Sequence, residues 1–191
     1  MKEFFVPAVV TPDPDANASD LLVDRVRQTP NGALFALPTA DGGWSDLTAA
    51  EFHRQVKALA KGFIAAGVQP GEKIGFMCKT RYEWTLVDFA TWFAGAVLVP
   101  IYETSSPSQV QYILEDSEAH HMIVETADHF ARYDEVAGDL PHIGHLWQMH
   151  LGDLEKLAST GEGVTNDELE ARRTIAKGSA SATEIYTSGS T

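Results

Sequence analysis

The sequence predicts an α/β domain built on a mostly parallel sheet with helices on both faces. Short apolar runs alternate with helical segments at least three times, and this alternation is typical of strand–helix–strand connections. The apolar runs lack the alternation of apolar and polar residues that half-exposed strands show, so both faces of the sheet should be buried. With 191 residues, the chain is long enough to form such a domain around a sizeable core.

The first segments surround this domain rather than form its sheet. Residues 1–18 contain several prolines and are expected to form an extended arm. Ser19 is placed to cap a short helix that runs to Gln28. The apolar run over 33–37 and the Asp-Gly-Gly turn over 41–43 predict a hairpin with the residues that follow.

The clearest helix of the chain begins after Thr48. Thr48 and Glu51 stand at the spacing of a capping box, in which each side chain binds the backbone amide of the other residue. Gly67 is placed to close the helix, and Pro70 prevents it from continuing. Between these signals, apolar residues recur at intervals of three and four and form one face: Phe52, Val56, Leu59, Ala60, Phe63 and Ile64.

The remaining elements alternate along the chain. Strands are predicted from apolar runs over 73–78, 97–101, 121–125 and 143–149. Helices are predicted over 82–96, over 128–138, and after Ser106, which is followed by Pro107 at the first helical position. Beyond residue 151 the signal is weaker, with two polar helices over 152–159 and 165–175 and then a linker of Gly, Ser and Ala.

Composition excludes several classes of function. The formal net charge is −13, with 27 acidic against 14 basic residues, and no basic stripe is present for a nucleic acid. Cys78 is the only cysteine, so an internal disulfide is excluded, and a buried thiol in a reducing compartment is expected. The N-terminal apolar run is short and interrupted by Pro7, which fits neither a signal peptide nor a membrane span. We therefore expect a soluble, cytoplasmic protein.

The last eight residues, "EIYTSGST" (184–191), have the composition of a phosphate-binding loop. Four hydroxyl side chains surround Gly189, which lets the backbone approach a ligand, and consecutive amides in such a turn form an anion-binding nest. A solvated linker has the same composition, so the motif alone leaves both interpretations open. Neither G-x-x-x-x-G-K-[ST] nor G-x-G-x-x-G occurs in the chain.

Three segments in order give this loop a context. "YTSGST" resembles the front half of the phosphate loop of the AMP-forming acyl-adenylating enzymes, a superfamily of acyl-CoA synthetases, luciferases and peptide-synthetase adenylation domains. Residues 47–77 resemble the opening helix and strand of that superfamily. Residues 81–125 resemble its long-chain fatty acid–CoA ligase (acyl-CoA synthetase) branch, with "VPIYETSS" as the most specific part. The resemblance extends from about residue 20 to the end, and it implies the N-terminal subdomain of an acyl-CoA synthetase-like fold.

The resemblance implies a two-step ligase reaction. A fatty acid carboxylate attacks the α-phosphate of ATP to give an acyl-adenylate and pyrophosphate, and the thiol of coenzyme A then takes the acyl group and releases AMP. The first step brings two anions together, so amides, hydroxyls, a metal ion and a lysine must neutralise charge. The resemblance also implies that the hydroxyl of Ser190 contacts Mg²⁺. The residues that would bind the ATP phosphates are Thr187, Ser188, Gly189, Ser190 and Thr191.

The same resemblance identifies parts that the chain lacks. The loop of the superfamily continues through another glycine to a Pro-Lys-Gly segment, and the motifs for adenine, ribose and metal, the hinge and the C-terminal catalytic lysine follow later. We therefore expect an N-terminal fragment of a longer enzyme, without catalytic residues of its own. Its expected parts are an extended arm (1–18), an α/β subdomain (19–151), a helical and linker segment (152–182), and a strand with a truncated loop (183–191).

Two alternative functions stay open. A non-catalytic binding or assembly module could keep an adenylating-type fold without its chemistry, and another acyl-adenylating ligase could act on an aryl acid or an amino acid. The expected partners are small molecules, namely a fatty acid, ATP and coenzyme A. The sequence leaves peripheral contact with a membrane and homo-oligomer formation open.

Several other side chains suggest a site but are better explained by structural roles. Four aromatic residues have the character of an acyl-tunnel wall, although core packing explains them better. Spacing argues against a metal site for the histidines. An acidic cluster near a helix end is better explained as a solvated face than as paired catalytic carboxylates, because no apolar pocket residue surrounds it in sequence. These residues are Trp84, Phe89, Trp92 and Phe93; His120, His121, His142, His145 and His150; and Glu115, Asp116 and Glu118.

A chain that carries only the hydroxyl half of the loop should bind ATP weakly. A hydrogen bond to a charged group contributes about 1.5–3 kcal/mol, so the missing lysine alone costs roughly one to two orders of magnitude in affinity. Isothermal titration calorimetry of residues 1–191 with Mg-ATP should therefore show no binding tighter than about 1 mM. A sub-millimolar Kd would contradict this expectation.

Overall fold

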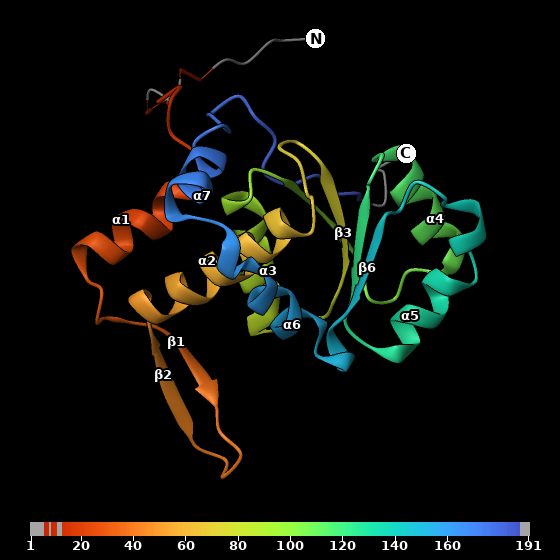
Figure 1. Cartoon of the computed structure of the whole chain (residues 1–191), viewed down its shortest axis with the longest axis horizontal. Coiled ribbons are helices and arrows are strands. Elements are labelled where there is room, and N and C mark those ends of the chain that lie inside the picture. Colours follow the sequence, from red (N-terminus) through yellow and green to blue (C-terminus); the bar gives the residue numbers. More distant parts are fainter. Residues whose placement is uncertain (1–5, 8, 11–12, 188–191) are drawn as a thin grey trace.

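Four parallel strands form the main sheet of the protein, in the order β4-β3-β5-β6 (Figure 1). The computed structural model describes residues 6–7, 9–10 and 13–187. Gly75 at the centre of the sheet lies opposite Val99 on one side and Met122 on the other. The predicted parallel sheet is confirmed, and its strands are β3 (Lys73–Met77), β4 (Val97–Ile101), β5 (His121–Val124) and β6 (His145–Gln148).

Helices cover both faces of this sheet, as the uninterrupted apolar strands predicted (Figure 1). Successive residues of a strand point to opposite faces, so Phe76 enters one core cluster and Met77 enters the other. The first cluster packs against α2 (Ala49–Ala65), α3 (Tyr82–Phe93) and α6 (Asp153–Thr160). The second packs against α4 (Pro107–Asp116) and α5 (Ala127–Asp134).

The other elements surround the first helical layer. The antiparallel hairpin of β1 (Ala33–Pro38) and β2 (Trp44–Thr48) forms a separate two-stranded sheet that projects from this layer, as Figure 1 shows. The helices α1 (Asp20–Gln28) and α7 (Asn166–Arg173) pack against the same layer through Leu22 and Leu169. Short 3₁₀ turns occur at Ala137–Asp139, Met149–Leu151 and Gly161–Gly163.

The helices begin where the sequence predicts, but only some of the predicted capping hydrogen bonds form. At α4 the predicted cap is complete, because the side chains of Ser106 and Gln109 each bind the backbone amide of the other. At α2 only half of the capping box forms: Thr48 accepts a bond from the Glu51 amide at 3.2 Å, whereas the Glu51 carboxylate binds Arg54.

The prediction that Ser19 caps α1 with its side chain is wrong. The backbone of Ser19 is already helical, with φ −69° and ψ −22°, so its hydroxyl is turned away from the first free amides of the helix. The Ser19 side chain is buried instead, where it lies beside Asn17 and accepts a hydrogen bond from Arg173 Nη1 at 2.9 Å.

Two glycines allow α2 to approach α6 and the turn that follows it. A Cβ atom built on Gly62 would lie 2.2 Å from the carbonyl oxygen of Leu157, and one built on Gly161 would lie 2.6 Å from the Gly62 nitrogen. Both contacts are with backbone, which cannot rotate away as a side chain can. The polar segment after residue 151 is therefore fixed to the sheet domain by close backbone packing.

Replacing Gly62 by alanine should destabilise the fold. Alanine in a helix interior normally stabilises by about 0.5–1 kcal/mol relative to glycine, but overpacking at this contact should reverse the sign and cost about 1–3 kcal/mol. Urea unfolding followed by circular dichroism measures the change. Gly138→Ala is the matched control, because no atom lies within 4 Å of its added Cβ. A Gly62→Ala protein as stable as the control variant would disprove the close contact.

Candidate functional site

The segment before the predicted phosphate loop extends the sheet beyond β4. Leu98 donates its amide to the Ala182 carbonyl at 3.2 Å, and Glu184 donates to the Leu98 carbonyl at 2.9 Å. These bonds form a parallel bridge between Leu98 and Thr183. Because the segment runs parallel to β4, the residues after it leave at the carboxyl edge of the sheet, where open α/β sheets bind ligands.

Side chains from two other elements hold the continuation of this segment. Lys73 at the start of β3 forms an ion pair with Glu184 at 2.7 Å. The hydroxyl of Tyr186 lies 2.7 Å from Asp116 Oδ2 and 3.0 Å from Glu184 Oε1, and its ring packs edge-on against Tyr112 of α4. Burial, together with these two carboxylates, raises the pKa of Tyr186. The tyrosine of the motif is thus a neutral anchor.

The predicted phosphate-binding residues fall at the limit of the described chain. Thr187 is exposed just beyond the Tyr186 anchor. Ser188, Gly189, Ser190 and Thr191 lie outside the described residues, and this includes the predicted Mg²⁺-linked position at Ser190. Over residues 13–187 no group of three or more His, Cys, Asp and Glu side chains is placed to hold a metal ion.

A cavity of about 230 Å³ lies beside this segment, at the carboxyl ends of β3 and β4. Ile185 contributes to it from the segment and Trp84 from α3, so the cavity adjoins the approach to Thr187. Apolar groups form most of the wall, and Thr80 and Glu103 supply polar atoms. The full lining is Cys78, Thr80, Trp84, Pro100, Ile101, Tyr102, Glu103 and Ile185.

The "VPIYETSS" motif forms one wall of this cavity and the start of α4. Arg132 of α5 donates to the backbone carbonyls of Glu103 at 2.5 Å and of Ser105 at 3.3 Å. Ser106 then caps α4. The loop between β4 and α4 is therefore held at both ends, and it presents Tyr102, which is 61% exposed, to the cavity.

A buried carboxylate organises the loops after β3 and β5. Glu125 follows β5 and is 8% exposed. It accepts the Lys79 amide at 2.8 Å and Arg81 Nη1 at 3.0 Å, while Arg81 also binds Glu83 at 2.5 Å. Burial opposes ionisation of Glu125, but the bonds from Lys79 and Arg81 outweigh it, and the pKa of Glu125 lies below its ordinary value.

This ion pair lies at the point where the sheet topology changes direction. From β3 the chain moves to β4 on one side and then crosses to β5 on the other, so the switch point is between β3 and β5. Open α/β sheets often bind ligands in the crevice there, and Arg81 and Glu125 line a cavity of about 320 Å³ at this position. The sequence gives no signal for the pair, because the two residues are 44 positions apart.

The other candidate residues are dispersed rather than assembled into one site. Cys78 is buried, as predicted, and burial followed by the Glu125 charge raises the pKa of its thiol. Phe93 is a core residue, and Phe89 packs against Phe52 and Trp92. Core packing is therefore the correct interpretation for these two aromatic residues.

Of the five histidines named from the sequence, one is buried and four are exposed. His121 is buried, and its Nε2 lies 3.1 Å from the Glu72 carboxylate, while its ring stacks on His145 and Trp147. Burial is the main effect that lowers the pKa of His121, although Glu72 opposes it. His120, His142, His145 and His150 are exposed.

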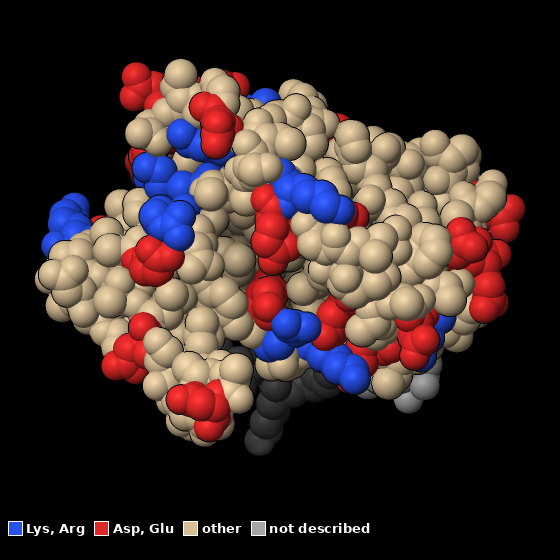
Figure 2. All heavy atoms as spheres, turned by 60° about the horizontal axis from the view of Figure 1, so that its bottom comes forward, with Lys and Arg blue, Asp and Glu red and all other residues tan. Residues whose placement is uncertain are grey.

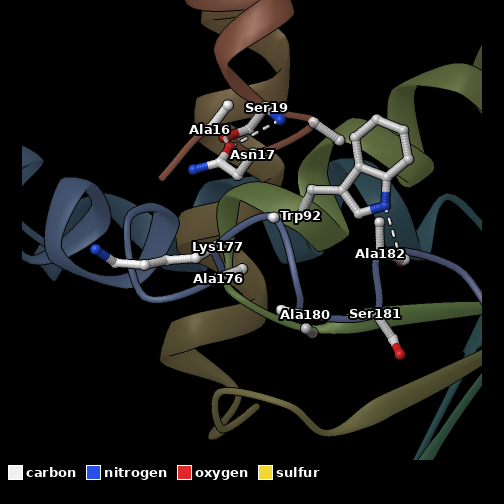
Figure 3. A pocket seen from close by; sticks show the side chains of 12 residues that line it. Ala16, Asn17, Ser19, Trp92, Ala176, Lys177, Ala180, Ser181 and Ala182 are labelled. Carbon is white, nitrogen blue, oxygen red and sulfur yellow. Dashed lines mark hydrogen bonds between the residues drawn. The ribbon is translucent and has the colours of Figure 1, made fainter. Parts of the chain in front are cut away.

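Trp92 belongs to a different hollow, where the N-terminal arm meets the linker before the loop. Figure 3 shows this pocket of about 270 Å³, with Asn17 and Ser19 on one side and Lys177 and Ala182 on the other. The indole Nε1 of Trp92 donates to the Ala182 carbonyl at 2.9 Å. The four aromatic residues named from the sequence therefore do not line a common tunnel.

Charge on the surface is divided into small groups. On the face in Figure 2, Lys and Arg side chains lie in separate groups beside Asp and Glu side chains. Elsewhere along the described chain, ion pairs such as Arg54–Glu51 and Lys156–Asp153 also join neighbouring charges of opposite sign. Among the helices that the structure describes, none has the length and apolar character required to cross a bilayer.

Comparison with known proteins places the chain in a family. A family model described as "AMP-binding enzyme" matches residues 22–191. The long-chain-fatty-acid–CoA ligase FadD15 of Mycobacterium tuberculosis is 38% identical over 194 residues, which cover 100% of this chain and 32% of the relative. The chain thus spans about a third of the length of that curated relative.

Solved structures share the fold. A long-chain-fatty-acid-CoA ligase (FadD1) from Archaeoglobus fulgidus gives a TM-score of 0.74 at 19% identity, over 97% of this chain and 37% of that chain. VinN in complex with L-aspartate gives 0.68 at 26% identity, over 90% of this chain and 44% of that chain. The predicted acyl-CoA synthetase-like fold is confirmed.

Replacing Glu125 by glutamine should destabilise the carboxyl edge. Glutamine keeps the shape but removes the charge, and it has a single acceptor oxygen where Glu125 uses one oxygen for Lys79 and the other for Arg81. The expected loss is about 1–3 kcal/mol at neutral pH, measured by urea unfolding. Glu83→Gln is the control, because this more exposed pair should contribute less than about 1 kcal/mol.

The stability difference between wild type and Glu125→Gln should decrease as the pH falls. The pKa of Glu125 is lowered in the folded state, so its contribution is present above the ordinary value of 4.5 and is lost as the pH falls below it. The difference between wild type and Glu125→Gln should therefore shrink in acid. A difference that stays constant down to pH 3 would contradict the ion-pair explanation.

Proposed function

Because the chain belongs to the AMP-binding enzyme family, we propose that the whole protein that carries it is a long-chain fatty acid–CoA ligase. This protein would activate a fatty acid with ATP to an acyl-adenylate and transfer the acyl group to coenzyme A. The observation that carries the proposal is 38% identity to FadD15 across the full length of this chain. The residues described here would form its first subdomain and would not be catalytic alone.

The described residues support a phosphate-binding role for the end of the chain. The parallel bridge to Leu98 and the Tyr186 anchor direct Thr187 to the carboxyl edge, where its exposed side chain is free to meet a ligand. A hydroxyl can donate to a phosphate oxygen without adding a fixed charge. We propose that Thr187 is the first hydroxyl of the phosphate site, and that Ser188, Gly189, Ser190 and Thr191 continue it.

A magnesium ion bound to ATP would supply charge neutralisation in this reaction. We propose that the Ser190 hydroxyl is its contact in this chain, because hydroxyl oxygen is a ligand that Mg²⁺ accepts beside water and phosphate. Thr187 would orient the phosphates next to it. The expected partners are small molecules, namely the fatty acid, ATP and coenzyme A, and we place the protein in the cytoplasm.

A second candidate function has one observation in its favour. VinN, which is 26% identical over 90% of this chain, was solved with L-aspartate, so a protein with this fold binds an amino acid. Substrate choice separates the two candidates. The non-catalytic module predicts no adenylation with either kind of acid.

Pyrophosphate exchange tests the proposal directly. The whole natural protein that carries this chain should exchange labelled pyrophosphate into ATP when a long-chain fatty acid is added, and not when L-aspartate or an aryl acid is added. Exchange with L-aspartate alone would favour the second candidate. No exchange with any of these acids would favour the non-catalytic module.

Replacing Thr187 by valine should raise the KM for ATP in this assay. Loss of a hydrogen bond to a charged phosphate is worth about 1.5–3 kcal/mol, which corresponds to roughly 10- to 100-fold. Ser159→Ala is the control, since this exposed hydroxyl on α6 bonds only the Lys156 carbonyl within its own helix. An unchanged KM for ATP in Thr187→Val would remove this residue from the site.

A further inference from the structure

A groove on the helical layer lies between α2 and the end of α6 with its 3₁₀ turn over Gly161–Gly163. Its volume is about 360 Å³, which is within the range of small-molecule sites. Side chains of α2 form one wall, and Ala158, Gly161 and Glu162 form the other. The close contact of Gly62 with Leu157 brings the two helices together along this hollow, which we call the α2 groove.

Basic side chains of α2 line the groove, namely His53, Arg54, Lys57 and Lys61. His53, Lys57 and Lys61 follow one another at intervals of four residues, so they lie along one face of the helix. Lys61 begins close against the opposite wall, since a Cβ atom built on Gly161 would lie 2.6 Å from the Cβ of Lys61. Lys57 and Lys61 are both half-buried. The groove therefore presents a row of basic groups along one wall.

The ammonium groups of Lys57 and Lys61 have no partner in the part of the chain that the structure describes. Within residues 13–187, every arginine side chain binds a carboxylate or a carbonyl oxygen, and so do all lysines except Lys57, Lys61 and Lys79. Carboxylates are abundant in a chain of net charge −13. Two neighbouring lysines that none of them binds are therefore an exception in this protein.

This arrangement has an electrostatic cost. Like charges four residues apart on a helix repel one another, and Lys57 and Lys61 have this spacing. The carboxylate of Glu162 is in the lining, but it forms no ion pair with either lysine. With Arg54 included, three cations face one carboxylate, so the lining has an excess of positive charge. An anion from outside the chain would offset the repulsion.

His53 adds a polar group to the groove without adding charge. Burial, followed by the charge of Lys57, lowers the pKa of His53, so its imidazole is neutral at neutral pH. The ring packs edge-on against Phe93, with 5.6 Å between the ring centres. A neutral imidazole has one donor and one acceptor nitrogen. A bound anion should therefore change the pKa of His53, because the nearby positive charge would be neutralised.

We propose that the α2 groove binds a phosphate monoester between the ammonium groups of Lys57 and Lys61. Such a group carries about two negative charges at neutral pH, which matches two unpaired ammonium groups with three donors each. The volume leaves room for a small organic group beside the phosphate. The same chemistry occurs in soluble metabolites and in the lipid headgroup of phosphatidic acid. The site is distinct from the proposed phosphate loop, which follows the segment bound to β4 and α4.

An NMR titration of residues 1–191 with glycerol 3-phosphate tests the proposal. It is carried out at constant ionic strength and at about pH 7.5, where the phosphate is mostly a dianion. The amide signals of Lys57, Lys61 and Gly161 should shift along one saturating curve in the millimolar range. The pKa of His53 should rise in the saturated protein. The amide of Ile123 in the buried strand β5 is the internal control and should not shift.

Four substitutions separate a specific site from general charge. Lys57→Gln and Lys61→Gln should each weaken binding by about three- to tenfold. Glu162→Gln should strengthen it by about two- to fivefold, because a repelling carboxylate is lost. Lys156→Gln is the matched control: it removes the same charge from α6, at a lysine that Asp153 already binds, and should leave the Kd unchanged. If a lysine variant does not fold, the effect of Glu162→Gln decides the matter.

Two kinds of vesicle identify the source of the phosphate. Cosedimentation with phosphatidylcholine vesicles only when they contain phosphatidic acid, and its loss in Lys57→Gln and Lys61→Gln, would indicate a lipid headgroup. Saturation by glycerol 3-phosphate without such cosedimentation would indicate a soluble ligand. The proposal fails if neither probe binds, or if Lys57→Gln and Lys61→Gln bind as tightly as Lys156→Gln. These measurements use neither ATP nor a fatty acid, so they are independent of pyrophosphate exchange.

Discussion

Burial of the sheet on both faces is the constraint on which the rest of this structure depends. Alternate residues of the short strands enter different cores, so that Ile74 and Phe76 pack on one side and Met77 on the other. Packing is close enough that a Cβ on Gly75 would lie 2.5 Å from the Leu114 side chain. With both faces covered, polar groups can gather only at the strand ends, and the carboxyl end is where the loops of this chain converge.

The electrostatics of that edge follow from the acidic composition. Arg81 is already bound by Glu83 and Glu125, and Arg132 is used by backbone carbonyls of the loop after β4. These cations hold the loops in place and have little charge left for an anionic ligand. In a chain of net charge −13, a phosphate at this edge would depend on amides and hydroxyls of the terminal loop, on the exposed Lys79 that follows β3, and on cations from elsewhere.

Local patterns in the sequence predict where the helices and strands lie, but they do not predict which distant residues come into contact. Residues 97–101 are predicted as a strand and form β4 with the same bounds. An uninterrupted apolar run between Gly95 and a polar loop buries its side chains best as a strand inside the sheet. The helix predicted to Ala96 ends at Phe93, since Gly95 adopts a φ of 77° that closes it.

Side-chain contacts between distant residues could not be predicted from the sequence. Tyr186–Asp116 and Trp92–Ala182 join residues 70 and 90 positions apart, and no local sequence pattern indicates such pairs. The side-chain cap predicted for Ser19 does not form because its backbone is already helical, and the hydroxyl binds Arg173, 154 positions away, instead.

The attachment of residues 182–184 differs in kind from that of the central strands. A full strand pair would be fixed by a ladder of bonds and would open only with the domain, whereas two backbone bonds and one indole bond contribute about 1 kcal/mol each. Local opening of a few kcal/mol is within the range that proteins sample without unfolding. An element of this strength can hold residues 182–184 against β4 and still open while the central strands stay paired.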